Sequence, residues 1–168
     1  MQFRSSIVLL LFLFTAPACR PKATCGDIQF NSAESYVEFV ELQKSRIDSA
    51  MRKLDQAFEK GSDQNIKIRY NQLVSTCDSV LLQTRDLSPF VQDSILKNSS
   101  WKLFSFYNEI FHNEYRELLE IYFAESIPDY IARQHAQSIM KQVSHDEDSL
   151  RMIFQESVKT FVHRNAAD

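Results

Sequence analysis

Glycine and proline are scarce in this sequence, which contains two glycines and four prolines among 168 residues. Sheet proteins need many turn residues of these kinds, and proline interrupts helices. The long stretches that lack both residues therefore exclude a sheet-rich fold and favour long helices. Two glycines are also too few to build a glycine-rich loop that cradles phosphate.

Long hydrophobic runs are missing as well, except for one at the N-terminus. Arg4 supplies a positive charge, Ile7–Phe14 reads IVLLLFLF, and the small-residue sequence Ala16–Ala18 follows. These are the three parts of a secretory signal. The run is about half of the ~20 residues that a helix needs to cross a membrane. We therefore predict a cleaved signal peptide over residues 1–18 and no transmembrane helix.

Only three cysteines occur, and the first directly follows the predicted cleavage site. Cys19 resembles the cysteine of a bacterial lipobox, and either the lipoprotein signal peptidase or the general one would cut before it. A lipid on Cys19, carrying acyl chains such as palmitate, would attach the protein to a membrane without spanning it. Lipidation of Cys19 would also leave an even number of cysteines that can pair, namely Cys25 and Cys77. These two either form a disulfide, or Cys77 is a small buried core residue on a helix.

The sequence has no strong excess of either charge. Loss of Arg4 with the signal leaves 18 basic and 22 acidic residues, and no basic stripe is visible. Because phosphate binding needs such a stripe, we expect no nucleic-acid partner. No nucleophile stands in a recognisable setting and no haem motif is present, so we predict neither an enzyme nor a cofactor.

Apolar residues recur at steps of three, four and seven along four segments, the pattern of amphipathic helices. The first predicted helix begins at Asn31, which with Glu34 forms a capping box, and ends at Gly61 in a left-handed cap. The second runs from Asp63 to Ser88.

The third predicted helix runs from Asp93 to Ala124, and the fourth follows Ser126, with Pro128 in its first turn. A polar run at 144–148 preserves the apolar phase, so the fourth helix should be continuous. Short connections favour antiparallel neighbours. The predicted fold is therefore an all-α, up-down four-helix bundle over residues 31–168, preceded by a lipidated tether over residues 19–30.

Metal-binding patterns are weak. Glu109 and His112 have the Glu-x-x-His spacing of di-iron bundles, but no second copy exists and the pair points away from the apolar stripe. We predict a solvated surface pair. The other histidines, His135, His145 and His163, are spaced too widely to converge on one metal, so no metal site is predicted.

The third predicted helix carries more apolar surface than one stripe requires. The additional residues flank or oppose its main face: Trp101, Phe106, Leu119 and Phe123. They are either a surface for a protein partner or an apolar ligand, rimmed by charge, or part of a wide buried arc between two neighbouring helices. The sequence leaves both interpretations open.

Two runs, YVEFVELQKSRIDSAMRKLDQAF at 36–58 and ILKNSSWKLFSFYNEIFHNEYRELLEIY at 95–122, carry a resemblance. They resemble a leptospiral-type family of bacterial surface lipoproteins of unknown function, over most of the mature chain. The resemblance implies an exported helical protein and supplies no catalytic residues.

The sequence therefore predicts a lipoprotein of the cell envelope, anchored at the outer membrane. Both the periplasmic and the surface face of that membrane fit the sequence. Its expected role is that of a non-enzymatic interaction or structural module. The alternative is a bundle that binds a small ligand or a metal.

Overall fold

A computed structural model describes residues 22–124 and 129–165 of the chain. The predicted signal peptide, Cys19, Ser126 and Pro128 lie outside the described residues. In chain order the elements are β1 (Ala23–Cys25), β2 (Ile28–Phe30), α1 (Ala33–Lys60), α2 (Asp63–Thr84), α3 (Ile95–His112), α4 (Glu114–Phe123) and α5 (Asp129–Asn165).

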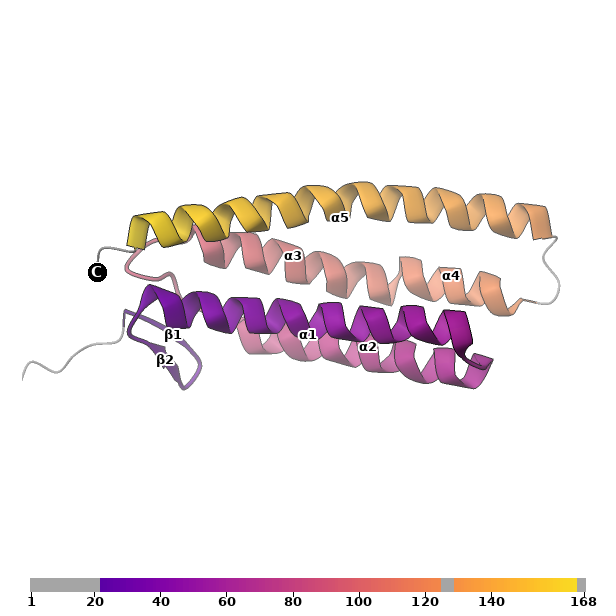
Figure 1. Ribbon diagram of the computed structural model, residues 1–168, viewed down its shortest axis with the longest axis horizontal. Helices are drawn as coiled ribbons and strands as arrows, with labels where there is room; N and C mark the ends of the chain where they lie inside the picture. The colour runs from indigo at the N-terminus through magenta and orange to yellow at the C-terminus, as the bar shows by residue number, and fades with distance from the viewer. Residues whose placement is uncertain (1–21, 125–128, 166–168) are drawn as a thin grey trace, which may run out of the picture.

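The protein is an all-α, up-down helical bundle, as the apolar spacing predicts (Figure 1). Helix α1 leads away from the end where the chain enters, α2 returns, α3 and α4 lead away again, and α5 returns to that end. Helix α2 packs on α1 and α3, and α5 packs mainly on α3. No helix in residues 22–124 and 129–165 is long and apolar enough to cross a membrane.

The bundle core contains most of the residues of the apolar stripes. Helix α5 is continuous across 144–148, as predicted, because its apolar phase is kept there. The largest buried side chains that the helices contribute are Tyr36, Ile47, Leu54, Ile66, Leu73, Phe104, Tyr107, Phe111, Phe154 and Phe161.

Both predicted ends of the first helix need correction. Ser32 is the N-cap in place of Asn31, because its hydroxyl accepts a hydrogen bond from the Ser35 amide at 3.2 Å. Gly61 has an extended backbone, with φ −93° and ψ 167°, and is not left-handed. Glycine suits this position because a Cβ would collide with the Ala57 carbonyl oxygen.

The predicted tether differs most from the structure, because its described part is folded. Strands β1 and β2 form an antiparallel hairpin around Gly26, whose φ of 57° suits a tight turn. The chain after α2 joins this hairpin, since the Ser88 amide donates to the Thr24 carbonyl at 2.7 Å. The folded domain thus begins by Lys22, nine residues earlier than predicted.

An aromatic cluster underlies the hairpin and closes this end of the bundle. The Tyr36 ring stacks on Phe161, with centroids 5.3 Å apart, and contacts Phe30 and Phe90 at 5.2 and 5.6 Å. The Tyr36 hydroxyl donates to the Ser88 carbonyl at 2.8 Å. The cluster therefore ties α1, α5, the hairpin and the connection between α2 and α3 together.

The third predicted helix is two helices, because the helical backbone is interrupted at Asn113, with φ −114° and ψ −78°. Asparagine side chains compete for backbone hydrogen bonds and disfavour helix interiors. Packing changes at this break: α3 buries eight of its 18 residues, whereas α4 buries only Leu119.

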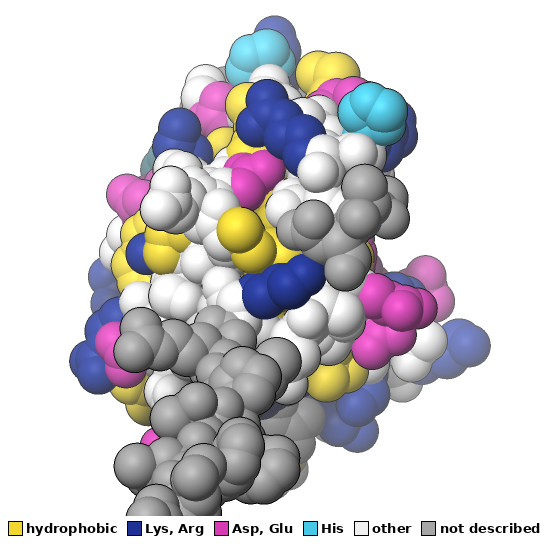
Figure 2. Space-filling model, turned by 90° about the vertical axis from the view of Figure 1, so that its left-hand side faces the viewer, with side chains coloured by type: hydrophobic (Ala, Val, Ile, Leu, Met, Phe, Trp, Pro, Cys, Tyr) yellow, Lys and Arg dark blue, Asp and Glu magenta, His cyan; other side chains and the backbone are white. Residues whose placement is uncertain are grey.

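The end face near the hairpin has a mixed surface. Figure 2 views the molecule from this end and shows basic, acidic and apolar side chains interspersed, without a field of one sign. One of its surface pairs joins Arg164 to Asp93, with 3.7 Å between Nη1 and Oδ2.

Candidate functional site

A groove of about 560 Å³ lies between α1, α4 and α5, at the end of the bundle opposite the hairpin. Its walls are mostly apolar. The lining residues are Asp55, Phe58, Tyr115, Leu118, Leu119, Ile121, Tyr122, Ala124, Arg133, Ala136 and Met140. This volume and lining are typical of sites for small molecules.

The groove exists because the apolar stripes continue beyond the well-packed part of the bundle. Phe58 and Tyr122 fit the apolar stripes of their helices and yet are 40% and 56% exposed. Among residues 130–142 of α5, no side chain whose burial is described is fully buried. Within the described residues, the far third of the bundle therefore leaves aromatic and aliphatic side chains partly exposed.

Aromatic contacts organise the rim. The Phe58 and Tyr122 rings meet edge to face, with centroids 5.5 Å apart, and Tyr122 contacts Phe123 at 5.1 Å. The Lys67 ammonium lies 4.4 Å from the centroid of the Phe123 ring. These contacts join α1, α2 and α4 at the groove.

The α1 wall of the groove carries a carboxylate in a negative environment. Burial raises the pKa of Asp55 above its ordinary value, and the nearby charges of Glu59 and Glu147 raise it further. Burial also raises the pKa of Tyr115 to about 12, with smaller contributions from Glu147 and Asp55. Arg133 lines the α5 wall.

A half-buried polar network joins α1, α3 and α5. The Tyr107 hydroxyl donates to Glu147 Oε1 at 3.0 Å, and Arg151 Nε donates to the same oxygen at 2.7 Å. Arg151 Nη2 also donates to Asp48 Oδ1 at 3.1 Å, and Lys44 Nζ donates to Asp48 Oδ2 at 2.6 Å. Two cations and two carboxylates thus balance, and together they fix the register of α5 against α1 and α3.

The four residues predicted as a partner surface do not form one surface. Trp101 is 39% exposed near the start of α3, and Phe106 and Phe123 are half-buried against the core. Leu119 is buried and lines the groove. Trp101 and Phe123 are 22 residues apart, about 33 Å along helical backbone. The wide buried arc accounts for most of this apolar excess, and only Leu119 belongs to the groove.

Cys25 and Cys77 are both buried free thiols in the structure, so the candidate disulfide is not formed there. The Cys25 thiol donates to the Gln83 carbonyl at 2.7 Å. Gln83 is six residues beyond Cys77 on α2, about 9 Å along the helix, whereas bridged Cα atoms lie roughly 4.4–6.8 Å apart. Burial raises the pKa of Cys77 to about 12, which keeps its thiol protonated.

Glu109 and His112 are exposed, as predicted. His112 Nε2 lies 2.8 Å from Asp78 Oδ1, and the Asn108 amide donates to the same oxygen at 2.7 Å. The pKa of Asp78 is lowered, and the hydrogen bond with His112 makes the largest contribution to this shift. Within residues 22–124 and 129–165, no three His, Cys, Asp or Glu side chains are placed to hold a metal ion.

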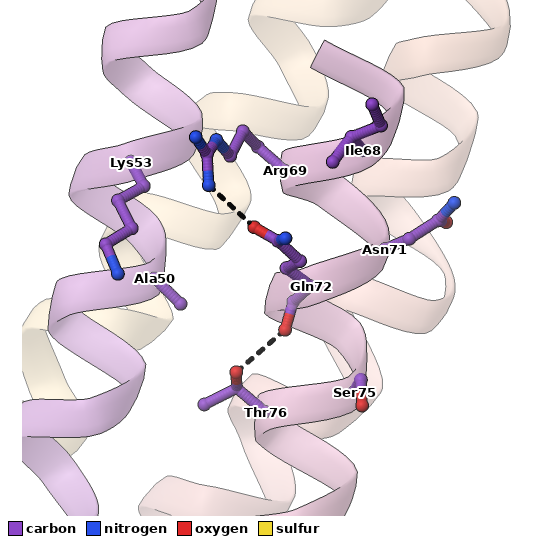
Figure 3. Close-up of a pocket in the computed structure, with 8 residues that line it drawn as sticks. All are labelled: Ala50, Lys53, Ile68, Arg69, Asn71, Gln72, Ser75 and Thr76. Atoms are coloured by element: carbon purple, nitrogen blue, oxygen red, sulfur yellow. Dashed lines mark hydrogen bonds between the residues drawn. The ribbon is translucent and has the colours of Figure 1, made fainter. Parts of the chain in front are cut away.

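A second groove, of about 720 Å³, lies between the outer faces of α1 and α2. Figure 3 shows Lys53 on α1 and Arg69 on α2 on either side of it. Its polar side chains bond within α2: Arg69 Nη1 donates to Gln72 Oε1 at 2.9 Å, and the Thr76 hydroxyl donates to the Gln72 carbonyl at 2.7 Å. This groove lacks the aromatic lining of the first.

Sequence reasoning did not single out Asp55 or Tyr115, which give the groove its polar wall. The available signal was the position of Phe58 and Tyr122 at the ends of their stripes, where fewer neighbours can cover them. Comparisons with protein-family models, curated proteins and solved structures find no match to this chain.

Proposed function

We propose that the protein is an exported, lipid-anchored and non-enzymatic module of the cell envelope, which stands on the outer membrane at its hairpin end. In this proposal the groove between α1, α4 and α5 is the binding site. The lipid is attached to Cys19, and the resemblance to leptospiral-type surface lipoproteins supports the same location.

The observation that carries the proposal is where the fold begins. Lys22 is already part of the fold, because its amide donates to the Phe30 carbonyl at 2.9 Å and its carbonyl accepts from the Val91 amide at 3.1 Å. Three residues of chain span at most about 10 Å. A lipid on Cys19 would therefore hold the hairpin end close to the membrane surface.

The groove lies at the other end of the molecule. Asp55 is 22 residues beyond Ala33, the start of α1, which places it about 33 Å further along the bundle. An anchored bundle that stands upright would therefore hold the groove well clear of the lipid headgroups. Such a position suits a module that binds a molecule in the space beyond the membrane.

Metabolic labelling with a clickable fatty acid tests the anchor. We expect label on the wild-type protein and on the matched variant Cys25→Ala, and complete loss of label from Cys19→Ala. Cys25 is the suitable control because it is the next cysteine in the chain and is buried in the fold. Label that persists on Cys19→Ala, or wild-type protein that takes up none, would contradict the proposal.

A further inference from the structure

The groove has walls of two kinds, which together define a ligand chemistry. The apolar wall is formed by side chains of α4 and α5 together with Phe58. The polar wall is formed by Asp55 of α1 and Tyr115 of α4. A molecule that fits both walls has an apolar part and one polar group.

The charges near the α1 wall favour a cation. Asp55 is surrounded by the carboxylates of Glu59 and Glu147, and all three disfavour an anion at this wall. Glu147 is already paired with Arg151, so part of its charge is compensated, whereas Asp55 itself lines the groove. Arg133 lines the α5 wall, which places the cationic group on the opposite side, beside Asp55.

The aromatic lining favours the same chemistry. Faces of tyrosine and phenylalanine attract ammonium groups through the ring quadrupole. Tyr115 and Asp55 both line the groove. Phe58 and Tyr122 complete an aromatic rim.

We propose that this groove binds an apolar molecule that carries an amine, with the apolar part against Phe58, Tyr122 and Met140 and the ammonium beside Asp55. This inference rests on the proposed function, in which the groove is the binding site. It deepens that function by naming the chemical class of the ligand.

Three probes of equal chain length test the inference: octylamine, octanol and octanoate. They are titrated by calorimetry into the otherwise complete chain carrying Cys19→Ala. We expect octylamine to bind most tightly and octanoate least. Asp55→Asn should weaken octylamine binding roughly 2- to 5-fold, the upper part of the range expected for one exposed charge pair, and leave octanol binding unchanged. Phe58→Ala should weaken all three probes.

Two controls separate binding from folding. Asp86→Asn removes an exposed carboxylate at the hairpin end and should change none of the affinities. Emission of Trp101, the only tryptophan, should be the same in every variant if the fold is intact.

The outcomes distinguish the inference from the function on which it rests. Octanoate that binds as tightly as octylamine, or an unchanged octylamine affinity in Asp55→Asn, would overturn the amine class and keep the groove as a site. No binding of any probe would overturn both the inference and the binding role of the groove. Heat on dilution of the protein alone that Phe58→Ala abolishes would mean that a second copy occupies the groove, which also overturns the inference.

Discussion

Replacing Phe161 with alanine is expected to lower the free energy of unfolding by about 3–5 kcal/mol, the range for a buried phenylalanine. Phe161 is fully buried, stacks on Tyr36 and meets Phe90 edge to face at 5.6 Å. Its removal leaves a cavity and loses two aromatic pairs, each of which contributes beyond the area it buries. The loss is large beside a typical stability of about 5–15 kcal/mol. Urea unfolding followed by circular dichroism measures it.

The next residue provides a matched control. Val162 belongs to the same turn of α5 and is 45% exposed. Val162→Ala should change stability by no more than about 0.5 kcal/mol. Equal losses in the two variants, or a loss below about 1 kcal/mol for Phe161→Ala, would mean that the aromatic cluster does not secure the hairpin end.

Arg151→Met is expected to lower the free energy of unfolding by about 2–3 kcal/mol, the loss expected when hydrogen bonds between charged groups are removed. Arg151 is the centre of the half-buried network, with bonds to both Glu147 and Asp48. Its guanidinium also lies 5.6 Å from the centroid of the Tyr107 ring. Methionine keeps much of the side-chain length but leaves both carboxylates, which are largely buried, without this partner. Thermal and urea unfolding measure the effect.

Two further substitutions show whether geometry or charge matters. Arg151→Lys keeps the charge but cannot bond both carboxylates through a planar fork, so it should recover only part of the loss. Lys159→Met removes an exposed pair with Glu156 on the same helix and should cost less than about 1 kcal/mol. Full recovery by lysine, or a similar cost for Lys159→Met, would contradict the role of the network.

The helices could be predicted from the sequence because their signal is local. Apolar residues such as Ile47, Leu73 and Phe154 recur at helical spacing, and the packing of one stripe against another follows from it. The break at Asn113 was missed, because the apolar pattern runs on across it. Spacing reports which side of a helix is apolar and does not report where its backbone is interrupted.

The hairpin was missed for a different reason. Gly26 and Asp27 are a two-residue turn signal with apolar residues on each side, and Gly26 adopts a positive φ there. The strands are only three residues long, too short for an alternating pattern to be distinct. Residues 19–30 also begin at the predicted anchor, a position that favours the interpretation of this segment as a tether.

The groove could not be predicted because it depends on how far the helices extend past one another. Phe58 and Tyr122 fit the apolar stripes, and only their place beyond the well-packed core leaves them exposed. Asp55 has no motif of its own. Its significance comes from the groove that three separate helices form around it.

We propose that this bundle is held at a membrane by a lipid on its first mature residue. Intact-mass measurement of the protein extracted from membranes tests it most directly. The account predicts a chain that begins at Cys19 and carries the added mass of acyl chains. A chain that begins at Cys19 without added mass, or one that still begins at Met1, would contradict it.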